Sequence, residues 1–316
     1  MNRPILLADD LVERIHDAEE AARDCHLATD ALRAAESWRD DGEFQRSLRV
    51  SKGFIEGGQP WHHLVVETVR RDHVIRRSDV FEVASRLPSG ALDEQQATEL
   101  LVNVNAWGYN DTGYGAWRTK ELLAQPGFPR SATRALDILR TAGPVVAYYF
   151  LYNSAKDGSR DEGHVQGWGP AFFTKFLYFA DPENQPRAVR SRPTALILDV
   201  YMARAVNRIA PSKPLGHFRD NGWTTPQYAF YITLLDRLAT EQRSSDNALT
   251  PGIVEAVLFR RELDSGNGGS RGSGSTTRSS RPMTTGAPSC SARSLSWQSW
   301  ATRTAPTTRG RSCSGP

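Results

Sequence analysis

Apolar residues recur at helical spacing over most of the first 263 residues. In residues 8–38 they alternate with acids and arginines, as in an amphipathic helix, at Leu11, Ile15, Ala18, Ala22 and Leu27. Similar patterns, bounded by proline, glycine and capping residues, predict helices over residues 61–87, 92–107, 117–125, 131–156, 223–242 and 250–263. Residues 61–87 hold one helix or two, and the helix 131–156 is interrupted near Gly143 and Pro144. The pattern therefore predicts an all-α fold.

Three stretches depart from this simple pattern. Residues 40–60 form a glycine-containing connector with room for a short extended piece. Residues 108–117, "GYNDTGYGAW", contain three glycines and predict a turn-rich loop. Residues 195–210, "ALILDVYMARAVNRIA", begin as a buried apolar run and end as a helix.

The composition changes at residue 264. From there the chain is rich in Ser, Thr, Gly, Arg and Pro and has too few apolar residues to form a core, so we expect 264–316 to be disordered. This divides the chain into an N-terminal helical part (1–99), a helical domain (100–263) and a tail (264–316). Two interpretations of the tail stay open: a loose phosphate-binding arm, or an accidental extension such as the product of a shifted reading frame.

Removing the tail reverses the sign of the net charge. The tail holds seven arginines and one acid, which leaves 32 basic and 35 acidic residues in the rest, a net charge of −3 against +3 for the whole chain. The net charge of residues 1–263 therefore gives no indication of nucleic-acid binding. Any such function has to depend on a local site.

Cysteine and histidine positions favour neither disulfides nor a metal. The three cysteines are Cys25, Cys290 and Cys313. No two of them have the spacing of a metal site. Three histidines could suggest a metal site: His62, His63 and His73. No acids or further histidines at metal-ligand spacing accompany them. No Walker or Rossmann glycine pattern occurs, so we expect no cofactor. Without a signal peptide or a long apolar run, the sequence predicts a soluble, cytoplasmic monomer that does not bind membranes.

Residues 165–179, "VQGWGPAFFTKFLYF", place Gly167 and Gly169 around Trp168 and then begin an aromatic helix at Pro170. Glycine tolerates positive φ, and proline in the first helical turn loses no hydrogen bond. The free amides of such a turn and helix start favour an anion. We therefore expect a hairpin whose backbone binds a phosphate and whose tryptophan is anchored in the core. A plain turn between helices is the alternative.

Asp199 lies at the end of the apolar run "ALIL" and just before a helix. A carboxylate there is partly desolvated and directed by the helix start. It is either an ordinary N-cap residue or a reactive group.

The hairpin "VQGWG" and the later "LILDVYM" together resemble the helix–hairpin–helix DNA glycosylase superfamily, in which "LPGVG"-type hairpins precede a "VDxH"-type aspartate. Tyr201 stands where many members have histidine. The segments "GPAFFTKFLYFA" and "VEAVLF" are most similar to bacterial proteins with an 8-oxoguanine DNA glycosylase-like fold, over roughly residues 100–262. The resemblance implies a helix–hairpin–helix domain over 100–263 that excises a damaged base, such as an oxidised purine, from duplex DNA.

The resemblance also implies the catalytic residues. Asp199 would stabilise the positive charge that develops on the sugar as the base leaves. Bifunctional members carry a lysine nucleophile two residues after the second hairpin glycine, but that position here is Ala171. Lys175, one turn further on the same face, is the candidate instead, so lyase chemistry stays open. The four-cysteine pattern with which some members hold an iron–sulfur cluster is absent.

Aromatic residues near residues 107–118 are candidates for the wall of a pocket for the extruded base. They are Trp107, Tyr109, Tyr114 and Trp117, with Trp223 as a further candidate in "DNGWTTPQY". Arg118 could hold a phosphate. The tryptophans are equally compatible with positions in the core.

Two functions other than base excision fit the same residues. One is a non-catalytic DNA-binding module, regulatory or defence-associated, in which the missing lysine at Ala171 leaves recognition without excision. The other is a helical protein–protein interaction domain in which the hairpin is only a turn.

Overall fold

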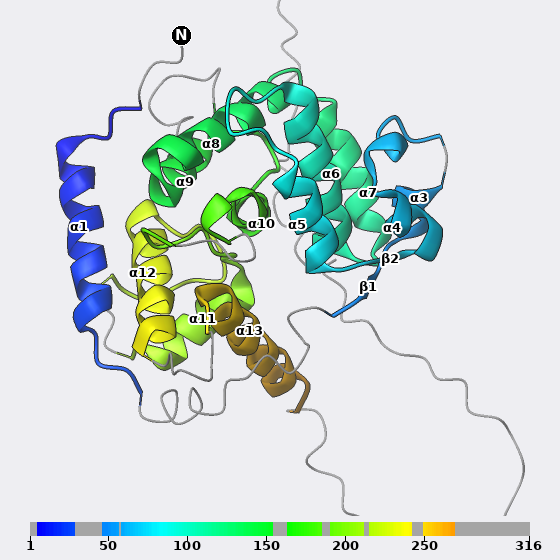
Figure 1. Ribbon diagram of the computed structural model, residues 1–316. Coiled ribbons are helices and arrows are strands. Elements are labelled where there is room, and N and C mark those ends of the chain that lie inside the picture. Colours follow the sequence, from blue (N-terminus) through cyan, green and yellow to red (C-terminus); the bar gives the residue numbers. More distant parts are fainter. Residues whose placement is uncertain are drawn as a thin grey trace, which may run out of the picture. The chain divides into compact units, whose positions relative to one another are not determined.

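The computed structural model describes residues 5–28, 46–56, 58–153, 163–184, 190–211, 215–241 and 249–268. Residues Met1–Arg271 form one compact unit (Figure 1). The tail predicted over 264–316 lies, from residue 269 onward, outside the described residues.

The described residues are mostly helical, which confirms the predicted all-α class. The first helical elements are α1 (Asp9–Asp24), α3 (Lys52–Ile55), the 3-10 turn η2 (His62–Leu64), α4 (Glu67–Asp72) and α5 (Arg77–Ser85). The middle of the chain forms α6 (Glu94–Tyr109), α7 (Gly113–Leu123), α8 (Phe128–Ala142) and α9 (Pro144–Asn153). The last elements are α10 (Pro170–Ala180), η3 (Pro182–Asn184), α11 (Val200–Ile209), α12 (Thr225–Glu241) and α13 (Pro251–Gly268).

A two-stranded antiparallel sheet joins the predicted connector to the segment after it. Strand β1 (Leu48–Arg49) pairs with β2 (Val74–Ile75), with Leu48 opposite Ile75. The extended piece expected in residues 40–60 is therefore present. The prediction of one or two helices over 61–87 was incomplete, because His73, in the left-handed region at φ 57°, ends α4 and leads into β2.

The predicted loop over residues 108–117 was wrong. Helix α6 continues to Tyr109 and α7 begins at Gly113, so only three residues connect them. The reason lies in packing: Gly115 sits directly against the Tyr109 side chain, where a Cβ atom would clash. This glycine serves the close approach of two helices and not a turn.

Other predicted helix boundaries also differ from the structure. The interruption at Gly143 is confirmed, since this residue has φ 85° and separates α8 from α9. Helix α1 ends at Asp24 and not at residue 38. Helix α13 extends to Gly268, past the expected boundary at 263, and an ion pair between Arg260 and Asp264 (3.1 Å) supports this last part.

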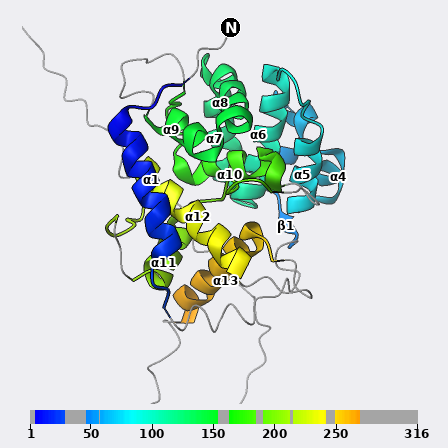
Figure 2. The same cartoon turned by 60° about the vertical axis from the view of Figure 1, so that its left-hand side comes forward.

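Helix α10 lies at the centre of the core. Its side chains Phe173, Phe176, Leu177 and Phe179 are buried, and the helix contacts α5, α6, α8 and α9. Helix α1 runs alongside α12 (Figure 2). Within the described segments, no helix combines the length and the apolar character needed to cross a bilayer.

Candidate functional site

Residues 163–169 form a tight turn that leads into α10. Gly163 and Gly167 have positive φ angles of 100° and 80°, and the Trp168 N–H donates to the Val165 carbonyl at 3.0 Å. Gly169 is the N-cap of α10. The Trp168 side chain is 2% exposed and packs edge-on against Phe128, so this tryptophan anchors the turn in the core as predicted. The segment before it, residues 154–162, lies outside the described residues.

Arg118 of α7 lies against the hairpin. A Cβ atom at Gly167 would come within 2.5 Å of Arg118 Nη1, so the absent side chain makes room for the guanidinium. The guanidinium donates to the Tyr114 hydroxyl and lies 5.1 Å from the ring centre of Trp117. Two residues predicted to contact DNA, Arg118 and Gly167, are thus neighbours in space.

Asp199 is the N-cap of α11. Its Oδ1 atom accepts hydrogen bonds from the N–H groups of Tyr201 (3.0 Å) and Met202 (3.1 Å). The extended segment before it runs beside α10, where the Thr174 hydroxyl accepts from the Leu198 N–H at 3.1 Å. Asp199 is 2% exposed.

Lys175 of α10 faces Asp199. Lys175 Nζ lies 3.7 Å from Asp199 Oδ2 and donates to the Ala171 carbonyl at 2.7 Å. Gly108 of α6 closes the other side of the lysine, because a Cβ atom there would lie 3.0 Å from Lys175 Cδ. Lys175 is therefore buried and does not extend to solvent as a surface lysine would.

Burial lowers the pKa of the Lys175 amine, while the negative charges of Asp199 and Glu255 oppose this effect. A lysine with a lowered pKa is more often neutral, and the neutral amine is the nucleophilic form. The arrangement thus provides a buried amine beside a buried carboxylate, and perturbed pKa values of this kind are common at functional sites.

The predicted base-pocket aromatic residues lie in different surroundings. Tyr109 is nearly buried and stacks on Phe172 at 4.7 Å between ring centres. Trp107 is partly buried and meets Phe179 edge-on at 5.1 Å. Trp117 is 50% exposed.

Trp223 is buried in the core. Its side chain is 2% exposed, and its indole N–H donates to the Arg219 carbonyl at 2.7 Å. Its own carbonyl accepts from the Tyr148 hydroxyl. Because both faces of the ring are buried, this tryptophan is a core anchor, and we leave it out of the site.

A second buried ion pair, missed from the sequence, lies next to Lys175 and Asp199. Arg77 of α5 and Glu255 of α13 approach to 3.4 Å, and both side chains are buried. The signal for Glu255 was an acid placed within the apolar run "GIVEAVLF" of a helix. Its partner could not be found from spacing, because it lies 178 residues away.

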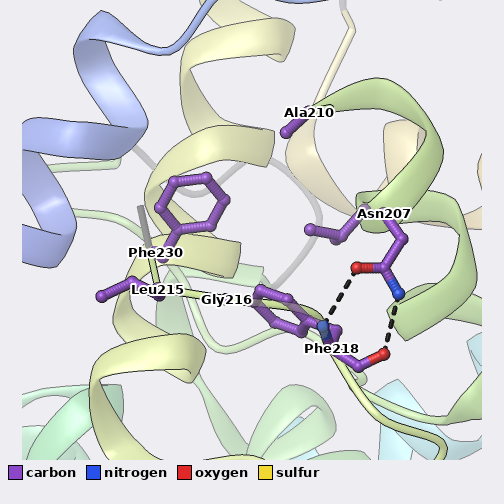
Figure 3. Close-up of a pocket in the computed structure, with 7 residues that line it drawn as sticks. Asn207, Ala210, Leu215, Gly216, Phe218 and Phe230 are labelled. Atoms are coloured by element: carbon purple, nitrogen blue, oxygen red, sulfur yellow. Dashed lines mark hydrogen bonds between the residues drawn. The ribbon is translucent and has the colours of Figure 1, made fainter. Parts of the chain in front are cut away.

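A small pocket near the end of α11 is not part of this site (Figure 3). Its walls come mainly from apolar groups of α11, α12 and the loop that includes Phe218. Asn207, its polar residue, accepts from the Phe218 N–H (3.0 Å) and donates to the Phe218 carbonyl (2.7 Å). Both polar atoms of the Asn207 side chain therefore bind the backbone of the loop.

Comparison with known proteins places the chain in a family. The model of the family described as "Putative 8-oxoguanine DNA glycosylase OGG-like protein" matches residues 42–259. The match begins well before residue 100, where the resemblance was expected to start. No curated protein matches the chain, and neither does any solved structure. Since the family model covers more than half of the chain and agrees with its helical fold, the chain belongs to this OGG-like family.

Proposed function

We propose that this protein is a DNA glycosylase that excises a damaged base from duplex DNA, with Asp199 and Lys175 as its reacting residues. The observation that carries the proposal is the 3.7 Å approach of the Lys175 amine to the Asp199 carboxylate, both buried beside the hairpin helix. The family description favours an oxidised purine as the base.

The position of the amine supports Lys175 as the nucleophile. Side chains on a helix lean toward its N-terminus, and Lys175 follows this rule by reaching back to the Ala171 carbonyl, 2.7 Å away. Its Nζ atom therefore lies beside residue 171, where bifunctional relatives carry their lysine. Although Lys175 is one helical turn further along the chain, its amine thus lies near the N-terminal end of α10.

The reaction would begin with the target nucleotide leaving the base stack. As the bond between base and sugar breaks, positive charge develops at C1′, and the Asp199 carboxylate stabilises it. The Lys175 amine adds to C1′ and gives one of its protons to the departing base. The C1′–O4′ bond then breaks, the second amine proton passes to O4′, and an imine between Nζ and C1′ remains.

The hairpin and Arg118 would hold the DNA strand. The amides of a glycine turn and of a helix start attract anions, and the Arg118 guanidinium beside Gly167 adds a positive charge at the same place. The half-exposed Trp117 offers a ring on which a base can stack.

A panel of duplexes with single lesions tests the proposal. The full-length protein is incubated with each duplex, and borohydride is added to reduce any imine to a stable amine. We expect release of an oxidised purine and a trapped adduct that disappears in Lys175→Ala but persists in Lys120→Ala, a lysine on the exposed surface of α7.

Other outcomes of this experiment lead elsewhere. Base release without trapping would mean that Asp199 acts with a water molecule and that Lys175 is not the nucleophile. Binding without release from any duplex would favour the non-catalytic DNA-binding module, for which Ala171 at the usual lysine position is the specific observation.

A further inference from the structure

The buried pair of Arg77 and Glu255 is connected to the candidate site through the protein backbone. Glu255 Oε2 accepts the N–H of Ile197, two residues before Asp199, at 3.1 Å. The Tyr231 hydroxyl donates to the carbonyl of the same residue at 2.7 Å. Both backbone groups of Ile197 are thus hydrogen-bonded. These two bonds fix the path of the chain that leads to Asp199.

Arg77 holds Glu255 from the opposite side. Besides approaching the carboxylate to 3.4 Å, it donates to the Tyr178 hydroxyl at 2.8 Å. Its guanidinium also lies 4.9 Å from the ring centre of Trp107. The pair therefore joins α5, α6, α10 and α13 around the segment that carries Asp199.

Stability alone does not explain two buried charges at this place. Removing charges from water costs free energy, and well-packed apolar residues often replace a buried ion pair without loss of stability. A role in the adjoining site accounts for both the charge and the hydrogen bond to Ile197.

We propose that Glu255, held by Arg77, is a positioning residue that fixes the Asp199 segment and whose negative charge acts on the Lys175 amine beside that segment. This inference rests on the proposed function of Lys175 and Asp199.

The charges around Lys175 determine the direction of the effect. Burial lowers the pKa of its amine, the carboxylates of Asp199 and Glu255 raise it, and Arg77 lowers it. The nearby phenols stay neutral over the useful pH range, because burial raises the pKa of Tyr178 to about 12 and that of Tyr231 well above its ordinary value. Loss of the Glu255 charge should therefore lower the pKa of Lys175.

The variant Glu255→Gln tests this directly. Glutamine has nearly the same shape and can still accept from the Ile197 N–H, but it carries no charge. The probe is a duplex with one abasic site, whose aldehyde carbon condenses with the Lys175 amine, losing water, to an imine that borohydride reduces. We expect the midpoint of the trapping rate to move to lower pH, so that trapping below the wild-type midpoint is several-fold faster.

The direction of the shift separates this effect from structural damage. Local unfolding would hydrate Lys175 and move its pKa up toward the ordinary value of 10.5. An unchanged or raised midpoint in Glu255→Gln would therefore overturn the inference. Tyr178→Phe is the matched control, since it removes one hydrogen bond to Arg77 without changing a charge, and its midpoint should not move.

A double variant covers the case in which Glu255→Gln does not fold. Arg77→Met with Glu255→Met replaces the pair by apolar side chains and should fold, but it leaves the Ile197 N–H without its acceptor. We expect at least about ten-fold slower trapping and faster hydrogen exchange at Ile197. Trapping and exchange at wild-type rates would contradict the positioning role.

A measurement without DNA keeps the inference distinct from the proposed function. The Lys175 amine is titrated by NMR in the free wild-type protein and in Glu255→Gln. If the wild-type protein traps no abasic duplex while its Lys175 pKa still falls in the variant, the proposed function fails and the coupling stands. If trapping occurs but the pKa does not fall, only the coupling fails.

Discussion

At the scale of single residues, the two oxygens of Asp199 have different partners. Oδ1 accepts both N–H groups at the start of α11, whereas Oδ2 faces Lys175 Nζ at 3.7 Å. Capping therefore fixes the carboxylate without using the oxygen that would act on the sugar. The structural and the catalytic interpretations of this aspartate are compatible.

Exchanging this aspartate for asparagine should separate the two roles. Asparagine caps helices about as well as aspartate, so the cap of α11 should persist in Asp199→Asn. Removing the charged partner of the buried Lys175 amine should still lower the free energy of unfolding, by up to about 3–5 kcal/mol. The carboxylate charge is lost, and we expect single-turnover base excision to fall on the order of 100-fold or more, with duplex binding kept. Urea unfolding and excision assays measure the two effects.

The matched control for this variant is Asp93→Asn. Asp93 caps α6 by accepting from the Gln96 N–H at 2.7 Å, but it is exposed and outside the site. Asp93→Asn should lose less than about 1 kcal/mol of stability and no activity. Equal excision by Asp199→Asn and the wild type would exclude Asp199 as the group that stabilises charge.

The lowered pKa of Lys175 predicts how activity depends on pH. Only the neutral amine attacks, so imine trapping should increase as the pH rises through the pKa of the folded protein. Because burial lowers that pKa, the midpoint should lie below the ordinary value of 10.5. Borohydride trapping on an abasic duplex over a pH series measures it, and a midpoint at the ordinary value would show that the amine is hydrated when it reacts.

At the scale of elements, the turn before α10 is in contact with α7 and the chain that follows it. Gln125 on the chain following α7 donates to the Gln166 carbonyl at 3.0 Å, and Arg118 of α7 occupies the space beside Gly167. The turn is therefore held by its neighbours as well as by its own glycines. We expect its geometry, and with it DNA binding, to depend on those contacts.

Two alanine substitutions in the hairpin should have unequal effects. Gly167→Ala adds a Cβ atom at φ 80° and against Arg118, so we expect a loss of about 1–2 kcal/mol of stability and weaker DNA binding. Gly169→Ala keeps its amide, has φ −79° and meets no atom within 4 Å, and should be tolerated. Thermal unfolding and a binding titration compare them, and equal binding by both variants would argue against the hairpin as the DNA contact.

At the scale of the whole molecule, the compact unit extends beyond the family match. Helix α1 lies before residue 42, yet it packs along α12, and Arg237 of α12 donates to the Cys25 carbonyl at 2.9 Å. The N-terminal helix thus covers a core helix. It contributes to the folded unit without contributing a residue to the candidate site.

The charge of the whole molecule predicts a modest dependence of DNA binding on salt. Residues 1–263 carry a net charge of −3, so binding should come from the hairpin and Arg118. Contact with one or two phosphates gives a slope of about −1 to −2 for the logarithm of affinity against that of salt concentration. The variant Arg118→Gln should reduce the magnitude of this slope by about 1. A much steeper slope in the full-length protein, unchanged in this variant, would locate the phosphate contacts elsewhere, such as in the arginine-rich tail.

The sequence by itself determined the features that depend on neighbouring residues. The break at Gly143, the turn at Gly167 and the cap at Asp199 could be read because backbone freedom and capping act within a few positions along the chain. Helical periodicity likewise determined the fold class.

Only the tertiary structure decided which residues meet. The hydrophobic pattern does not show that Lys175 reaches Asp199, or that Arg77 pairs with Glu255 across 178 residues. It also does not distinguish the buried Trp223 from the half-exposed Trp117. These outcomes depend on how helices far apart in the chain pack together, and packing is a property of the whole core and not of any local stretch.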